Sequence, residues 1–225
     1  MGRLVRRVFV SSLFTCLVTG FLVLLLLQRA EAAKTLDIAD ARALPVGTTV
    51  TIKGTVTVPS GAFASSFFDQ GFAVQDKSGG LYVSLQTNIG VEIRDQVEVT
   101  GVVQVSFGLL VLVPTDPEAI KLKGHGRRVQ PTVVRTGTVG ESTEGLLVGV
   151  DGVITEGPIN DLPFGYKFFM DDGSGAVQIF VNLETGIDVS ELGVGQHVRV
   201  IGFSSQFDTH YEIDPRQPSD ITVQP

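Results

Sequence analysis

The sequence predicts an all-β protein, with two tandem five-stranded barrels after an N-terminal hydrophobic segment that is expected to form a signal helix. Three observations lead to this prediction. Short runs of alternating apolar and polar residues recur along the chain, and the 26 glycines among 225 residues supply turns between them. The same order of strands and turns occurs twice after residue 35. No segment of this part has a convincing helical period.

The first 33 residues have the order of a secretory signal. Arg3, Arg6 and Arg7 precede an apolar run from Val8 to Leu27, and small residues at Ala30 and Ala32 fit a cleavage site. We therefore expect a signal peptide over residues 1–32 and an extracytoplasmic protein, secreted or periplasmic. The alternative is an uncleaved anchor, because a run of this length can cross a hydrocarbon core of ~30 Å. In either case, membrane contact is expected only through this segment.

The composition argues against several kinds of chemistry. Cys16 is the only cysteine and lies inside the predicted signal, so no disulfide or thiolate site is expected in the mature chain. There is no G-x-S-x-G elbow, and the loop Gly173-Ser174-Gly175 lacks the lysine of a phosphate-binding loop. The carboxylates at 171–172 and 208–214 lack the spacing of an EF-hand. We expect a non-enzymatic protein without a metal or cofactor.

The internal repeat begins with an alternating strand. Segment 49–58 places apolar side chains on one face and mostly threonines on the other, as a half-buried strand requires. Segment 148–155 has the same layout, and Gly152 there corresponds to Gly54. Each strand is followed by a loop of about ten residues and then by a second apolar segment.

A hairpin with an Asp-containing turn follows in both copies. It covers 72–83 in the first copy and 169–181 in the second, with Asp76 matching Asp172 and Gly79 matching Gly175. A carboxylate that accepts hydrogen bonds from nearby amides and a glycine that accepts positive φ explain such a turn. The expected fourth strands are 97–101 and 198–202, and the expected fifth strands are 109–113 and 211–213.

These repeats resemble the tandem OB-fold modules of bacterial exported proteins, which often accompany extracellular or surface nucleases. The resemblance is carried by residues 44–50, 75–83 and 97–101 and by their counterparts in the second copy. It implies OB-like domains over 36–122 and 131–225, joined by a basic linker at 123–130. This sequence departs from the family in two ways. We expect no nuclease domain in this chain, and short connections at 88–96 and 183–196 replace the usual helix between the third and fourth strands.

Charge is distributed unevenly between the two repeats. Residues 33–130 contain nine lysines and arginines and nine aspartates and glutamates, whereas residues 131–225 contain four and fourteen, a formal charge of −10. Non-specific binding to a phosphate backbone depends on lysine and arginine. Any nucleic-acid binding is therefore expected in the first module. Lys121, Lys123, Arg127 and Arg128 form the basic cluster, which is either a phosphate-contact patch or a solvated linker.

The candidate ligand face follows from the resemblance. In OB-folds, ligands cross strands two and three between the first and fourth loops. Strand alternation places Tyr82 outward, and the two loops contain Phe63, Phe67, Phe68 and Phe107. Stacking on a base contributes ~1–3 kcal/mol, and Lys53 and Lys77 are the nearest candidate phosphate contacts. The alternative is that these phenylalanines cap the open end of a small barrel or pack one module on the other.

The second module repeats this arrangement with few cations. Phe180 is expected to face outward on its third strand, with Phe164, Tyr166, Phe207 and Tyr211 around it. The leading hypothesis is therefore an exported OB-fold binding protein that holds single-stranded nucleic acid or oligonucleotides through the first domain. The alternative is a protein or glycan interaction module, which acts as an accessory subunit in the envelope and binds an envelope or secreted protein.

Overall fold

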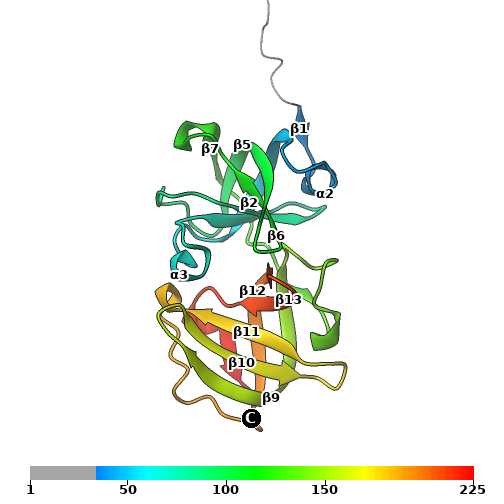
Figure 1. Ribbon diagram of the computed structural model, residues 1–225, viewed down its shortest axis with the longest axis vertical. Coiled ribbons are helices and arrows are strands. Elements are labelled where there is room, and N and C mark those ends of the chain that lie inside the picture. Colours follow the sequence, from blue (N-terminus) through cyan, green and yellow to red (C-terminus); the bar gives the residue numbers. More distant parts are fainter. Residues whose placement is uncertain (1–33) are drawn as a thin grey trace, which may run out of the picture. The chain divides into compact units, whose positions relative to one another are not determined.

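The computed structural model describes residues 34–225, so the predicted signal segment and its cleavage site lie outside the described residues. Strands make up most of the regular structure, and they form two closed five-stranded barrels in sequence order (Figure 1). The predicted all-β fold is confirmed. Among residues 34–225, no helix is long and apolar enough to cross a membrane.

The first barrel closes through five strands and carries one extra strand on each flank. Its elements are β1 (Thr35–Leu36), α2 (Ile38–Arg42), β2 (Thr49–Val58), α3 (Ala64–Phe67), β3 (Phe72–Gln75), β4 (Gly80–Val83), β5 (Asp95–Ser106), β6 (Leu109–Val113), the 3-10 helix η1 (Pro117–Ala119) and β7 (Ile120–His125). The barrel order is β2-β3-β4-β6-β5, and pairing of β5 with β2 closes it. The pairing of β4 with β6 is parallel, and the other four are antiparallel.

The second barrel repeats these pairings. Its elements are β8 (Thr132–Val133), η2 (Thr136–Thr138), β9 (Leu147–Asp161), β10 (Gly165–Asp171), β11 (Val177–Asn182), η3 (Leu183–Thr185), β12 (His197–Phe207), β13 (His210–Asp214), η4 (Pro218–Asp220) and β14 (Ile221–Val223). The order is β9-β10-β11-β13-β12, closed by β12 with β9, and β11 with β13 is the parallel pair. Two closed Greek-key barrels with this strand order have the OB topology.

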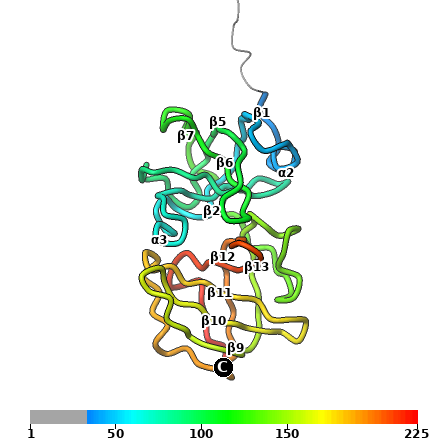
Figure 2. The backbone as a smooth tube through the Cα atoms, in the orientation of Figure 1, coloured from blue at the N-terminus to red at the C-terminus, as the bar shows by residue number. Residues whose placement is uncertain are grey.

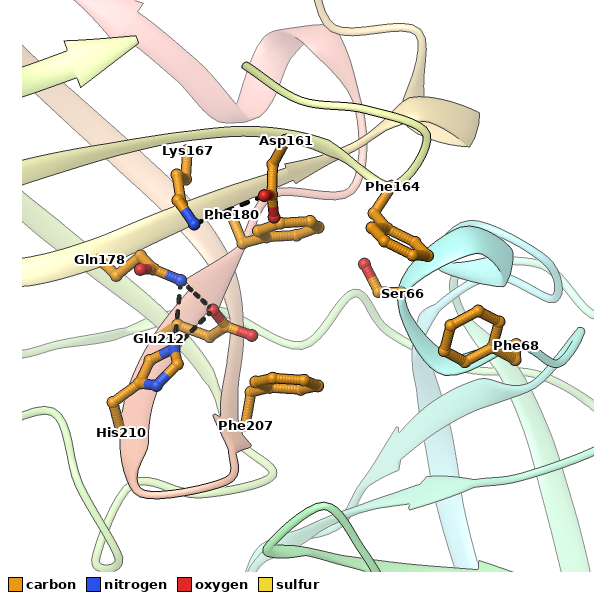
Figure 3. A pocket seen from close by; sticks show the side chains of 10 residues that line it. All are labelled: Ser66, Phe68, Asp161, Phe164, Lys167, Gln178, Phe180, Phe207, His210 and Glu212. Atoms are coloured by element: carbon orange, nitrogen blue, oxygen red, sulfur yellow. Dashed lines mark hydrogen bonds and ion pairs between the residues drawn. The ribbon is translucent and has the colours of Figure 1, made fainter. Parts of the chain in front are cut away.

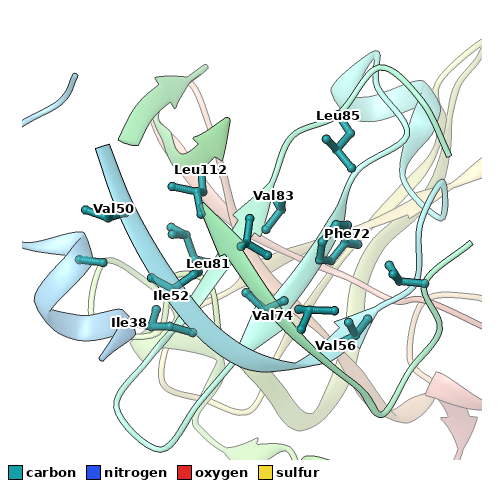
Figure 4. Close-up of a cluster of buried hydrophobic side chains, with 14 of the residues drawn as sticks. Ile38, Val50, Ile52, Val56, Phe72, Val74, Leu81, Val83, Leu85 and Leu112 are labelled. Atoms are coloured by element: carbon teal, nitrogen blue, oxygen red, sulfur yellow. The ribbon is translucent and has the colours of Figure 1, made fainter. Parts of the chain in front are cut away.

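Each barrel has its own apolar core. In the first barrel, the inward side chains of β2, β3 and β4 meet those of β5, β6 and α2 (Figure 4). Ile52, Phe72 and Leu81 are completely buried there. The second core is built from the matching strands around Phe168, Met170 and Ile179. The alternation in the sequence therefore positions both cores.

A third apolar cluster joins the two barrels. Phe203 of β12 packs among side chains of the first barrel: Val58, Ala62, Phe63, Ala73, Tyr82, Leu109 and Val111. The tube in Figure 2 shows α3 beside the end of the second barrel that it contacts. Arg216 extends the contact, since its Nη1 donates to the Thr57 carbonyl at 2.7 Å while Nε and Nη2 bind Asp220. Residues 35–225 therefore form one compact unit.

Backbone also meets backbone between the barrels. A Cβ built on Gly80 would lie 1.9 Å from the Gly145 carbonyl oxygen, and one on Gly145 would lie 2.2 Å from that of Gly80. Glu144, beside this contact, accepts from Arg42 at 2.8 Å and from the Leu110 amide at 3.3 Å. Only glycine fits at this approach, and the buried carboxylate ties both barrels to it.

We expect Gly80→Ala to lower the free energy of unfolding by about 1–3 kcal/mol, because the added methyl group overlaps main-chain atoms that cannot rotate away. Gly193→Ala is the control, since nothing lies within 4 Å of a Cβ there. The control should change stability by less than about 0.5 kcal/mol. Urea denaturation of both variants measures the difference, and equal stabilities would contradict the close approach.

Candidate functional site

The ligand face that the sequence suggested in the first barrel is covered. Tyr82 and Phe63 are each 1% exposed, because they pack against Phe203 of the second barrel. Phe67 stacks on Tyr82 with ring centroids 4.4 Å apart. The prediction that Tyr82 faces a ligand was therefore wrong. Alternation placed it outside its own barrel correctly, but a neighbouring barrel occupies that outside.

Tyr82 ends in a buried hydrogen bond. Its hydroxyl donates to Asp69 Oδ1 at 2.8 Å, and the Ser84 hydroxyl and the Gly71 amide also donate to Asp69. Burial raises the pKa of Asp69, and these hydrogen bonds only partly offset the rise. Burial, together with the charge of Asp69, raises the pKa of Tyr82 well above its usual range. The network fixes the 59–71 loop and leaves no acidic or phenolic group free for a ligand here.

The lysines of the first barrel converge on a carboxylate. Lys53, Lys123 and Lys121 lie 3.1, 3.1 and 3.9 Å from Glu98 oxygens, because β2, β5 and β7 are adjacent. Hydrogen bonds from Lys53 and Lys123 lower the pKa of Glu98. The three lysines are therefore less suited to bind phosphate, because the carboxylate of Glu98 already partly neutralises their charge.

The remaining predicted cations are scattered. Lys77 lies on the β3–β4 turn, and its Nζ is 3.5 Å from a carboxylate oxygen of Asp37. Arg127 and Arg128 are exposed in the segment after β7, and no ion pair to either is found within residues 34–225. The basic cluster is thus divided between strand β7 and the connection that follows it.

The corresponding face of the second barrel contains an open pocket. Its volume is about 160 Å³, and it lies over β10 and β11, between the β9–β10 hairpin and the β12–β13 turn. Figure 3 shows its lining: Ser66, Phe68, Asp161, Phe164, Lys167, Gln178, Phe180, Phe207, His210 and Glu212. Two of the predicted site residues, Phe68 and Phe180, meet here although they belong to different barrels.

A polar network forms the back of this pocket. Gln178 Nε2 donates to Glu212 Oε2 at 2.5 Å, and His210 Nε2 lies 3.5 Å from the same oxygen. The hydrogen bond with Glu212 raises the pKa of His210 above its usual 6.5. Strand alternation explains the grouping, because residues 210 and 212 on β13 share a face and Gln178 pairs with Glu212 across the parallel ladder.

Aromatic side chains from both barrels form the rest of the wall. Phe68 contacts Phe164 edge-on, with ring centroids 5.5 Å apart. Phe107 of the first barrel stacks on Phe207 at 5.4 Å, and the Asp208 amide donates to the Phe107 carbonyl. The β5–β6 and β12–β13 turns therefore hold each other, and Phe107 supports the pocket from outside its lining.

The α3 loop is fixed to the second barrel by Ser65. Its hydroxyl lies 2.7 Å from the Phe164 carbonyl, from Asn182 Oδ1 and from a Glu184 oxygen. A hydroxyl has one proton, so it donates to one of the three. These contacts hold the neighbouring Ser66 and Phe68 at the mouth of the pocket.

A buried carboxyl group lies at the end of β13, two residues after Glu212. Asp214 is 2% exposed, and neither of its oxygens has a hydrogen-bond partner within the described residues. Burial, reinforced by the negative charge of Glu212, raises the pKa of Asp214 well above its usual range. Among residues 34–225, no group of three or more metal-binding side chains is present.

Comparisons with known proteins extend only to fold. No family model and no curated protein matches the sequence. Among solved structures, a murine DNA-binding protein with double-stranded DNA is 9% identical over 78% of this chain and 96% of that chain, with a TM-score of 0.40. The hypothetical protein ygiW from E. coli is 19% identical over 40% and 89%, with a TM-score of 0.29. A replication protein A heterotrimer with single-stranded DNA is 13% identical over 82% and 51%, with a TM-score of 0.32. At these scores, the OB assignment depends on the strand pairings.

The sequence contained a signal for part of this pocket. Phe164 and Phe207 could be placed around Phe180 from the repeat, and strand alternation on β13 would have added His210 and Glu212. The contribution of Phe68 had no such signal, because it depends on how the barrels dock. The sequence did not predict that Lys167 and Asp161 line the pocket, because they form an isolated ion pair on a hairpin, with 3.6 Å between Nζ and Oδ1.

We expect Asp214→Asn to raise the free energy of unfolding at about pH 8. Asp214 has a raised pKa in the folded state, so its contribution to stability is full below the unfolded pKa and is lost as pH rises through the folded pKa. Asp214→Asn removes this loss of stability at high pH. The difference in free energy of unfolding between the variant and wild type should therefore shrink toward about pH 4. Urea denaturation across this range measures it. Asp208→Asn, at an exposed turn position, is the control. Parallel pH profiles for wild type and Asp214→Asn would contradict the assignment.

Proposed function

We propose that this chain is an exported, non-enzymatic OB-fold binding protein that holds a polypeptide partner on the open face of its second barrel. One observation supports this most directly. The pocket over β10 and β11 surrounds a nearly buried carboxylate with aromatic rings, whereas the matching face of the first barrel is filled by its neighbour. OB-folds bind ligands on this face.

Charge favours a polypeptide over nucleic acid. The second barrel belongs to the half of the chain with a formal charge of −10, which repels a phosphate backbone. Lys167 is the only lysine or arginine among the pocket residues, and Asp161 lies 3.6 Å from it. An acidic surface attracts a basic partner, and aromatic pockets are common anchoring points in protein interfaces.

Export is supported by the first 33 residues, where three arginines, an apolar run and a small-residue site follow the order of a secretory signal. The partner would then be a secreted or envelope protein. Residues 35–225 contain both cores and the contact between the barrels, so this unit is expected to fold without the signal.

Selection of a random dodecapeptide library on residues 34–225 tests the proposal. We expect enriched peptides that bind wild type and lose about tenfold or more in affinity with Phe207→Ala, because interface aromatic anchors commonly contribute 2 kcal/mol or more. Phe207 is 44% exposed, so its truncation should leave the core intact. Val194→Ala, at a side chain 66% exposed on another loop, is the matched control and should bind like wild type.

The same proteins are titrated with a labelled single-stranded DNA 15-mer and with a panel of oligosaccharides. Failure to enrich any peptide, or enrichment insensitive to Phe207→Ala, would refute a polypeptide ligand at this face. Binding of DNA or sugar that depends on Phe207 and competes with the peptides would reassign the face to that ligand.

A further inference from the structure

The lining of the pocket points to one chemical group. Resting on the proposed function, we infer that the partner inserts an arginine side chain, and that its guanidinium group binds Glu212 between Phe180 and Phe207. Three features carry this inference: a carboxylate oxygen without a partner, aromatic rings around it, and a charge balance that lacks a cation.

The carboxylate of Glu212 can accept a hydrogen bond from a ligand. Its side chain is 9% exposed, and Oε2 is engaged by Gln178 and His210. No partner for Oε1 is found within the described residues, and Figure 3 shows that the second carboxylate oxygen points into the space between the rings of Phe180 and Phe207. This oxygen faces the open pocket, and a charged donor that enters the pocket would form a charge-assisted hydrogen bond with it.

The rings favour a planar cation. Phe180 and Phe207 lie on either side of this oxygen, and Phe68 and Phe164 close the outer end (Figure 3). Guanidinium is flat and weakly hydrated, so it stacks on aromatic faces while donating in its own plane to a carboxylate. The ammonium group of lysine is compact and strongly hydrated, so it would bind less favourably between the two rings.

The charges around the pocket leave room for one positive group. Asp161 and Lys167 lie 3.6 Å apart, so they largely neutralise each other. Among the histidine and lysine side chains that line the pocket, His210 is then the one that contacts Glu212, and the hydrogen bond to Glu212 raises the pKa of that imidazole. The volume of about 160 Å³ suits a single side chain, since pockets for drug-sized ligands measure about 300–1,000 Å³.

Two pentapeptides test the inference, acetyl-Gly-Ser-Arg-Gly-Ser-amide and the same peptide with citrulline, which keeps the shape of arginine and removes its charge. Amide NMR spectra of residues 34–225 report the site. We expect the arginine peptide to shift the signals of Gln178, Phe180 and Glu212 and to bind about tenfold or more tightly than the citrulline peptide, as close charge pairs across an interface do.

The variant Glu212→Gln should lower affinity for the arginine peptide about tenfold while leaving citrulline binding nearly unchanged, which isolates the charge pair. Glu191→Gln removes the same charge at an exposed position of the second barrel and should act like wild type. Equal binding of the two peptides would overturn the inference. If library peptides still bind this face, the proposed function stands alone; if none bind, both fail.

Binding of the arginine peptide should also strengthen from about pH 6 to pH 8. Glu212, Gln178, Lys167 and Asp208 face His210, and the hydrogen bond to Glu212 raises its pKa above 6.5. Below that pKa the protonated imidazole competes with arginine for Glu212, and above it the neutral imidazole no longer does. His210→Gln should flatten the pH dependence, measured by the same titration. A profile that His210→Gln does not alter would contradict competition at Glu212.

Discussion

The docking of one barrel on the ligand face of the other is the constraint on which the rest depends. Phe203 is buried among first-barrel side chains, Arg216 reaches the Thr57 carbonyl, and Gly80 meets Gly145 without room for a methyl group. These contacts fix the α3 loop against β11 and η3. Phe68 can line a pocket of the second barrel only because this docking is tight.

Polar groups reinforce the same arrangement and keep it specific. Glu144 accepts from Arg42 and from the Leu110 amide, and Ser65 binds oxygens of the second barrel. Buried charges that are paired across a seam penalise any shifted docking, because a shift would leave them without partners. The apolar cluster packs the two barrels together, whereas the polar contacts define the register.

Much of the fold could be predicted from the sequence, because strand alternation and Asp-Gly turns are local properties. The predicted strand at 49–58 coincides with β2, and the predicted hairpin at 72–83 contains β3 and β4. The predicted hairpin at 169–181 overlaps the end of β10 and most of β11, but β10 begins four residues earlier. The flanking strands β1, β7, β8 and β14 were missed, since most are short and all lie at edges. The site was predicted less well, because the fate of Tyr82 depends on an interface between segments over a hundred residues apart, which no local pattern encodes.

The covered face of the first barrel has a consequence for valency. Two similar modules in tandem suggest two equivalent receptors and a gain in apparent affinity for repetitive ligands, but avidity requires that both faces be accessible at once. Here the candidate face of the first barrel packs against the second barrel, so the proposed ligand face of the second barrel has no accessible counterpart on the first. A repetitive partner would therefore gain no avidity from the duplication. The first barrel instead supports the second, because Phe68 contacts Phe164 and Phe107 stacks on Phe207.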